Sequence, residues 1–219
     1  MKKLYLLLLL APLCMCLHSC KPDDNTPPAP RVFKAPQEVI DYCYFKEGTY
    51  WIYRDSVSGQ YDTVSVISSN FDTLTNTNDG VKEYYDIFDV ITYRSFDKYN
   101  EATWLRDRPW LITGAPIVYQ TRYKPGDSKG TSIYHFHPYT LGRKIEDNND
   151  IISLSGALAS YTVLSQSYQS ILVFSHAKDP NYDYSSTKIY QAKNIGIIKK
   201  VITAKNQVWE LINYNIVQA

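Results

Sequence analysis

From residue 49 onward, hydrophobic and polar positions alternate mostly with a period of two, which predicts strands. Residues 49–57 are rich in aromatic and β-branched side chains, and Ser58 and Gly59 supply a turn before residues 61–68. A second hairpin turns at Asp79 and Gly80 and continues through residues 83–92. Three more hairpins are predicted from the pattern, and they pair residues 117–124 with 131–137, 161–167 with 170–176, and 187–203 with 208–217.

Nine to twelve strands joined by short turns predict an all-β fold with little helix. Such an antiparallel meander must curl into a barrel, a half-barrel or a sandwich to bury its aromatic side chains. Residues 37–44 suit a short helical turn before the first strand. Residues 151–160 are the candidate helix within the folded part, although Gly156 weakens it. The folded part shows no internal repeat, so we expect one domain.

The amino terminus has the pattern of a secretory signal. Two lysines after Met1 precede an apolar run at residues 4–17, which is shorter than the roughly 20 residues of a membrane span. The run ends in Leu17-His18-Ser19-Cys20, which resembles a bacterial lipobox. We therefore expect cleavage after Ser19 and acylation of Cys20 by diacylglycerol and a palmitate-type chain, which together hold a protein durably on a membrane. An ordinary signal peptide is the alternative.

The predicted organisation has three parts: a cleaved signal peptide at residues 1–19, a lipidated tether at residues 20–37, and a β domain at residues 38–219. The tether is extended, because its prolines exclude a packed helix or a central strand. Residues 21–25, Lys-Pro-Asp-Asp-Asn, resemble the signal that sends Bacteroidetes lipoproteins to the cell surface. We expect attachment to the outer membrane with surface display, and a periplasm-facing attachment is the alternative. The tether prolines are Pro22, Pro27, Pro28, Pro30 and Pro36.

Both ends of the β domain carry a family resemblance. Residues 44–53 read Tyr-Phe-Lys-Glu-Gly-Thr-Tyr-Trp-Ile-Tyr and precede Asp62-Thr63. Residues 194–199 and 209–214 form a closing hairpin pattern. These segments resemble uncharacterised outer-membrane or surface lipoproteins of the Bacteroidetes that have a single antiparallel β domain. The resemblance implies that fold and an envelope location, and it supplies no catalytic residues.

Charge and cysteine content narrow the possible partners. The chain has 23 Lys and Arg and 22 Asp and Glu, and loss of Lys2 and Lys3 with the signal leaves 21 − 22 = −1. This balance predicts no nucleic-acid partner. Cys43 is the one unmodified cysteine that remains, so an intramolecular disulfide is excluded, and its aromatic neighbours favour a buried thiol over a nucleophile. The sequence has no Gly-rich phosphate loop, and we predict no cofactor.

Two patterns of polar residues suggest chemistry. His135 and His137 lie on one face of a predicted strand, where they can share a metal with a third ligand such as His176 or Asp86. The alternative is two polar residues near a strand end. Asp86 and Asp89 are three positions apart and point to opposite faces, so they cannot converge on one sugar as a glycosidase pair does. The sequence also has no Gly-x-Ser-x-Gly nucleophile motif.

Aromatic side chains form the other candidate site, a ligand-binding surface. They suit half-wet binding surfaces, although they are also ordinary sheet core. We select Trp104, Trp110, Tyr119 and Tyr123 as candidate ligand-binding residues. Three functions stay open: a non-catalytic module that binds a glycan, a peptide or an envelope protein, an extracytoplasmic hydrolase that uses His135 and His137, and an envelope scaffold or assembly accessory. The wider set of rings that can face a ligand adds Trp51, Tyr53 and Tyr134.

Overall fold

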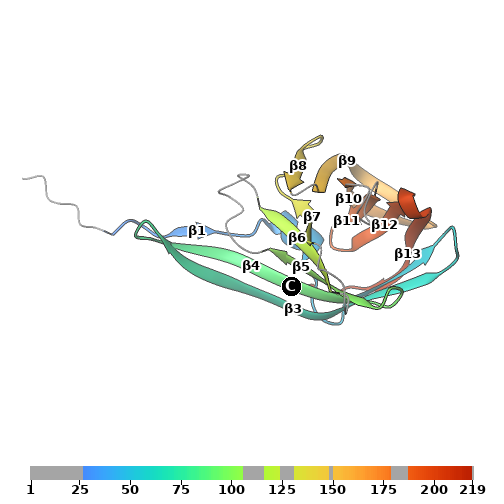
Figure 1. Ribbon diagram of the computed structural model, residues 1–219, viewed down its shortest axis with the longest axis horizontal. Coiled ribbons are helices and arrows are strands. Elements are labelled where there is room, and N and C mark those ends of the chain that lie inside the picture. Colours follow the sequence, from blue (N-terminus) through green and yellow to red (C-terminus); the bar gives the residue numbers. More distant parts are fainter. Residues whose placement is uncertain (1–26, 106–115, 124–130, 148–149, 179–186, 219) are drawn as a thin grey trace, which may run out of the picture.

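A computed structural model describes residues 27–105, 116–123, 131–147, 150–178 and 187–218 of the chain (Figure 1). Within these residues 13 strands form one sheet, which confirms the predicted all-β fold. The first half contains β1 (Arg31–Phe33), α2 (Gln37–Cys43), β2 (Tyr50–Asp55), β3 (Tyr61–Asn78), β4 (Val81–Arg94), β5 (Tyr99–Leu105), β6 (Ile117–Tyr123) and β7 (Thr131–Phe136). The second contains β8 (Lys144–Asp147), β9 (Asp150–Val163), β10 (Gln166–Lys178), β11 (Thr187–Ala192), β12 (Gly196–Ile202), a 3-10 turn (Thr203–Lys205) and β13 (Gln207–Asn215).

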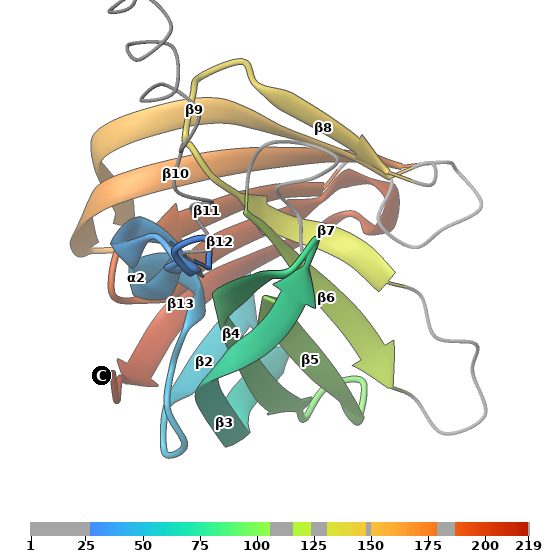
Figure 2. The same ribbon diagram turned by 90° about the vertical axis from the view of Figure 1, so that its left-hand side faces the viewer.

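The sheet is a curled antiparallel meander. Its strand order is β7-β6-β5-β4-β3-β2-β13-β12-β11-β10-β9-β8, so neighbours in the sheet are also neighbours in the chain except where β2 meets β13. That ladder pairs Trp51 with Tyr214 and Tyr53 with Leu211, and it joins the two halves. Strands β7 and β8 end the order, so the described sheet is curled without closing into a barrel. Figure 2 shows the strands arranged around a shared interior with α2 at the near end.

Two local predictions have different outcomes. Asp79 and Gly80 form the turn between β3 and β4 with φ values of 49° and 77°, as the Asp-Gly pair predicts. The candidate helix at residues 151–160 is wrong, because these residues belong to β9 and pair with β10 along its length. At Gly156 an added Cβ would lie 3.3 Å from Val173, so the glycine permits close packing in a strand. Cross-strand pairing therefore outweighs the local helical pattern.

Strands β3 and β4 continue beyond their neighbours as a long two-stranded arm, which extends to the left in Figure 1. Strand β1 lies in the segment predicted as a tether and pairs in parallel with residues 83–85 of β4. Two ion pairs fasten this segment to the arm, Arg31 with Glu83 at 3.4 Å and Lys34 with Asp86 at 3.2 Å. The tether therefore meets the folded part along the arm.

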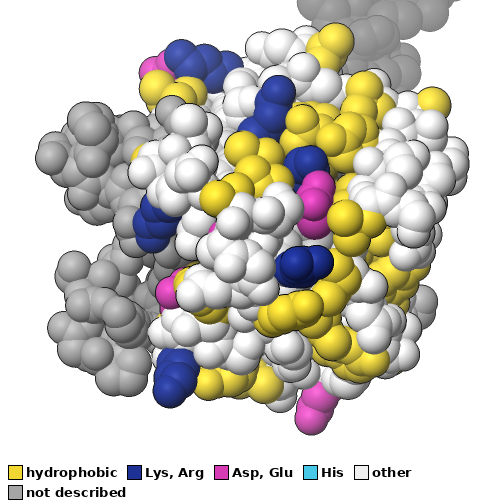
Figure 3. Space-filling view, turned by 90° about the vertical axis from the view of Figure 1, so that its right-hand side faces the viewer, with side chains coloured by type: hydrophobic (Ala, Val, Ile, Leu, Met, Phe, Trp, Pro, Cys, Tyr) yellow, Lys and Arg dark blue, Asp and Glu magenta, His cyan; other side chains and the backbone are white. Residues whose placement is uncertain are grey.

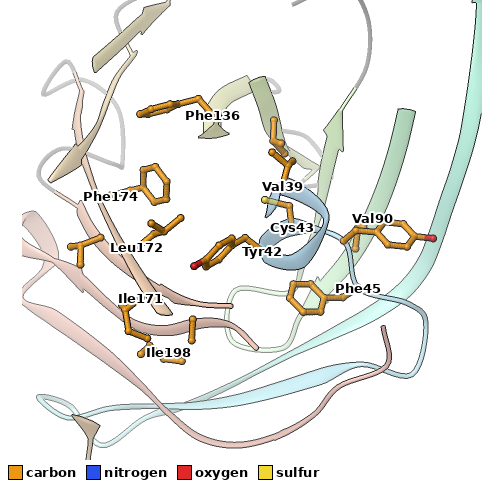
Figure 4. Close-up of a cluster of buried hydrophobic side chains, with 14 of the residues drawn as sticks. Val39, Tyr42, Cys43, Phe45, Val90, Phe136, Ile171, Leu172, Phe174 and Ile198 are labelled. Atoms are coloured by element: carbon orange, nitrogen blue, oxygen red, sulfur yellow. The ribbon is translucent and has the colours of Figure 1, made fainter. Parts of the chain in front are cut away.

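The helix α2 lies inside the curled sheet and contributes to its core. It presents Val39, Tyr42 and Cys43 to the interior, and Figure 4 shows these side chains between the strands, across from Phe174 and Leu172. Cys43 is buried with a free thiol, and burial raises the pKa of that thiol well above its usual value, as expected for a structural cysteine. No helix within the described ranges is both long and apolar enough for a membrane crossing.

The end of the molecule opposite the arm has a mixed surface. Figure 3 shows hydrophobic side chains there, interspersed with separate Lys or Arg and Asp or Glu side chains. Scattered charges of both signs produce no strong field of one sign on this face.

Candidate ligand-binding cavity

A cavity of about 90 Å³ lies inside the curled sheet. This volume has room for several water molecules or part of a small organic ligand. Both halves of the sheet contribute to its wall, together with the end of α2 and the segment that follows it. The lining residues are Tyr42, Cys43, Phe45, Trp51, Tyr53, Val64, Val90, Thr92, Arg94, Glu101, Thr103, Gln120, Tyr134, His176, Ile189, Gly196, Ile197, Lys200 and Trp209.

One part of the wall is aromatic. Trp51 donates its indole N–H to the carbonyl oxygen of Ile195 at 2.5 Å, and the Tyr53 hydroxyl donates to that of Ile197 at 2.9 Å. Gly196 has a φ of +94°, and an added Cβ would lie 3.2 Å from Nε1 of Trp51. A side chain there would be strained and crowded, so glycine allows the backbone to approach the indole. The polar atoms of both rings already bind the backbone, which leaves apolar ring surface for the cavity.

A neighbouring part of the wall is polar and contains a buried charge cluster. We call Asp62, Arg94, Tyr99 and Glu101 the Arg94 cluster. Nε and Nη2 of Arg94 both donate to Oδ2 of Asp62, the first at 2.8 Å. Nη1 donates to the Tyr99 hydroxyl oxygen at 3.3 Å and lies 3.9 Å from Oε1 of Glu101, which also accepts a hydrogen bond from that hydroxyl at 3.1 Å.

Electrostatics keep the guanidinium of the Arg94 cluster charged. Burial by itself would lower the pKa of Arg94, but Glu101, Tyr99 and Asp62 more than offset it, and the pKa is raised well above its usual value. Asp62 is fully buried, and Glu101 and Arg94 are nearly so.

Lys200 brings a positive charge to the same cavity from the other half of the sheet. It lies on β12, where alternation turns Ile198, Lys200 and Ile202 inward, and 8% of its surface is exposed. Strands β5 and β12 are separated by β4, β3, β2 and β13 in the sheet order. Glu101 and Lys200 line one cavity only because the sheet curls.

The structure divides the aromatic residues that the sequence singles out. Trp51, Tyr53 and Tyr134 line the cavity. Trp104 and Tyr119 come together on β5 and β6, where their rings stack with centroids 4.8 Å apart. Alternation places Trp104 on the face of β5 opposite to Glu101 and Thr103, away from the cavity. Trp110, the side chain of Tyr123 and the lipidation candidate Cys20 lie outside the part of the chain that the structure describes.

The two histidines proposed as metal ligands have other contacts. His135 is buried on β7, and its Nδ1 lies 2.9 Å from the Tyr139 hydroxyl. Burial is the main reason why the pKa of His135 is lowered from 6.5 to about 3. His137 follows the end of β7, and its Nε2 lies 3.1 Å from Oε2 of Glu38 on α2. Across the described ranges, no three or more His, Cys, Asp or Glu side chains are grouped so that they could hold a metal ion.

The conceivable third ligands lie in different places. His176 lines the cavity, whereas Asp86 lies on the arm and contacts Lys34. Asp86 also accepts a hydrogen bond from the backbone N–H of Ala35 at 3.2 Å, so its carboxylate helps to fasten the tether.

The charged residues of the cavity wall are not among the candidate site residues that the sequence analysis selected. The sequence did contain a signal for them, because charged residues occupy inward positions of alternating strands where an apolar residue is expected. These residues are Arg94, Glu101 and Lys200. No family model, curated protein or solved structure matches this chain. The functional argument therefore depends on the geometry of the cavity.

Proposed function

We propose that this chain is a non-catalytic binding protein of the bacterial envelope that holds a small organic molecule in the cavity. The observation that carries the proposal is the composition of the wall, where buried charges of both signs and aromatic rings together line about 90 Å³. Ligand sites in proteins combine mostly apolar walls with a few placed polar groups, and this wall has that composition.

The energetic argument is that a protein core contains charged side chains only where they have counter-charges or contribute to function. Burying an ionised side chain costs several kcal/mol, which contacts and counter-charges must offset. A core built for stability alone is simpler with apolar residues at the positions of Glu101 and Lys200. Their presence beside open space favours a polar ligand as part of their role.

Binding is favoured over catalysis by the state of the candidate reactive groups. The thiol of Cys43 lines the cavity, but burial raises its pKa and keeps it protonated. Nδ1 of His135 is occupied by Tyr139. These contacts favour the binding hypothesis over the hydrolase that uses His135 and His137.

The envelope location is supported by the amino-terminal pattern that ends at Cys20 and by the Pro-rich segment after it. In metabolic labelling with a palmitate analogue, the wild-type chain should take up label and a Cys20→Ala variant should not. Protease treatment of intact cells, beside a periplasmic control protein, tests surface display. Digestion of this chain alone supports it, and protection until the outer membrane is permeabilised supports attachment facing the periplasm instead.

The binding function is tested on the detergent-purified protein with a panel of amino acids, neutral sugars and aliphatic carboxylates. Thermal unfolding measures stabilisation, because a ligand that binds only the folded state raises the unfolding temperature in a concentration-dependent way. A Val64→Phe variant fills part of the cavity, and Val57→Phe adds the same bulk at a side chain that is 52% exposed.

A ligand that stabilises the wild type and Val57→Phe but not Val64→Phe supports the cavity as the site. Stabilisation that survives Val64→Phe places the ligand elsewhere and contradicts the proposal. A panel that stabilises none of the three proteins also counts against it.

A further inference from the structure

We infer that two copies of this chain associate through the arm, with β3 of one copy pairing antiparallel to β3 of the other about a two-fold axis at Thr73. This inference goes beyond the proposed binding function and does not depend on the cavity. It depends on an open strand edge, on the direction of the hydrogen-bonding groups along that edge, and on its length.

The open edge is formed by residues 67–78 of β3, and we call it the free edge. Strand β4 pairs with one side of these residues, whereas β2 pairs with the other side only as far as Ser65. Beyond that point none of the described strands continues the sheet, and none of residues 67–78 is buried. Figure 1 shows β3 along the margin of the arm, with β4 and then β1 on its other side.

The backbone N–H groups of every second residue point out of the free edge. The N–H of Val66 points toward the side of β2, because it donates to the carbonyl oxygen of Thr49 at 2.8 Å. The bulge between Val66 and Ser68 inserts one residue and shifts this alternation by one position. The outward N–H groups that follow the bulge are therefore those of Ser69, Phe71, Thr73, Thr75 and Thr77.

Two hydrogen bonds agree with this phase. The N–H of Thr73 donates to Oδ1 of Asp72 at 2.7 Å, and the N–H of Thr77 donates to Oδ1 of Asn76 at 2.8 Å. Each donor uses the side chain of the residue before it. A carbonyl oxygen of an added strand can replace these partners and extend the ladder.

The free edge has few of the features that keep strand edges from pairing. Exposed edges are usually short, or they are interrupted by proline or protected by charged side chains, lysine above all. Beyond the bulge at its start, this edge has no proline, lysine or arginine, and Asp72 is its one charged residue. It is instead rich in threonine, which favours strands. Its composition therefore suits an edge that is covered in the native protein.

The length of the free edge favours a second copy as the strand that covers it. A two-fold axis perpendicular to the sheet places residues of the same hydrogen-bonding phase opposite each other. With the axis at Thr73, Asn78 at the end of one arm faces Ser68 of the other copy, just past the limit of β2. An axis at Asp72 would bring Asn78 opposite Val66, whose N–H is already bound, and would place the two Asp72 carboxylates face to face.

The axis at Thr73 also gives compatible side-chain pairs. Thr73 faces its own equivalent, and threonine pairs across strands are favourable. Leu74, which is 42% exposed, becomes a diagonal neighbour of the second Leu74. Five outward residues on each of two copies supply about ten N–H to carbonyl hydrogen bonds, a number typical of specific interfaces.

The mass of the detergent-purified protein in solution is the first test, measured by light scattering with detergent micelles in excess over protein. We expect twice the chain mass for the wild type and the mass of one chain for Thr73→Pro. Proline removes the N–H at the axis, which points away from β4, so the hairpin should still form. Thr73→Val keeps the N–H and should remain a dimer. A monomeric wild type at its highest soluble concentration, or a dimer that survives Thr73→Pro, overturns the inference.

Disulfide formation tests the register without a disruptive variant. Opposite residues of a hydrogen-bonded antiparallel pair have Cα atoms about 5.5 Å apart, within the range of a disulfide. Under mild oxidation, Thr73→Cys should therefore yield a covalent dimer. Thr77→Cys is the matched control on the same edge, because it faces Ser69 of the other copy and lies far from its own equivalent. Equal cross-linking of both variants, or none of Thr73→Cys, contradicts the proposed axis.

Discussion

The packed part and the open part of the space inside the sheet are built by the same strands and differ in how they are filled. In the packed part, Phe136, Phe174 and Ile171 are fully buried and belong to the same core cluster as Val39 of α2 (Figure 4). In the open part, Arg94 and Glu101 take inward positions and line the cavity, together with Tyr42 and Cys43 at the end of α2. The curled sheet provides an interior along its length, and the chemistry of the inward residues decides whether it becomes core or site.

Packed core and cavity wall alternate within single strands. On β12, Ile198 is fully buried in the core, and Lys200, two residues later on the same face, lines the cavity. On β10, Phe174 packs against the ring of Phe136, and His176 lines the cavity. A step of two residues moves a side chain about 7 Å along a strand, which is enough to pass from packed core to open space.

The largest expected effect is a loss of folding free energy in acid, caused by the buried His135 in the packed core. Its folded-state pKa of about 3 lies below the ordinary value of 6.5, so the unfolded chain takes up this proton first as pH falls. The stability is fully present above pH 6.5 and is lost as pH falls toward 3, by about 5 kcal/mol when complete at about 1.4 kcal/mol per pKa unit. Urea unfolding between pH 7 and 4 measures this loss.

A His135→Gln variant should flatten that pH dependence, whereas His137→Gln, which removes an imidazole that is 24% exposed, should retain it. An identical pH dependence in wild type and His135→Gln would show that other groups control the acid response.

The next largest effect is expected from disrupting the Arg94 cluster. Asp62→Ala leaves the buried guanidinium of Arg94 without its closest carboxylate, and we expect roughly 3–5 kcal/mol of lost stability. Lys34→Ala is the comparison, because it breaks an ion pair in which the lysine side chain is 69% exposed, and it should cost about 1 kcal/mol or less. Urea unfolding at pH 7 measures both, and equal losses would contradict the difference in burial.

The smallest effect is expected from the loss of one methyl group, which can be compared between the packed core and the cavity wall. Ile198→Val in the packed core should cost about 0.5–1.5 kcal/mol, because the surrounding side chains close only part of the space. Ile189→Val on the cavity wall should cost less, since the methyl group already borders open space. The difference in urea midpoint tests whether the cavity is open in solution, and a larger loss for Ile189→Val would indicate that it is filled.

Local features of the fold were predictable from the sequence, and long-range ones were not. Alternation and the Asp79-Gly80 turn identify strands and a hairpin, because both depend on neighbouring residues. The helical interpretation of residues 151–160 was wrong, because pairing with β10 decides that segment. The ladder between β2 and β13 joins residues about 160 positions apart, and local pattern contains no information on it.

The site depended still more on tertiary structure. The contact of Asp62 with Arg94 requires the register between β3 and β4, and Lys200 reaches the cavity of Glu101 only through the curl of the sheet. Aromatic content indicated binding, and Trp51, Tyr53 and Tyr134 do line the cavity. Trp104 and Tyr119 stack on each other on the other face, because aromatic residues also pair across strands.

The most direct test of the cavity is a high-resolution crystal structure of the purified protein without added ligand. We predict electron density from water or a retained small molecule between Glu101, Lys200 and Trp51, with the core around Phe136, Phe174 and Val39 packed by side chains alone. A structure in which the side chain of Lys200, Trp51 or Trp209 fills that space would contradict the account, because no binding site would then lie inside the sheet.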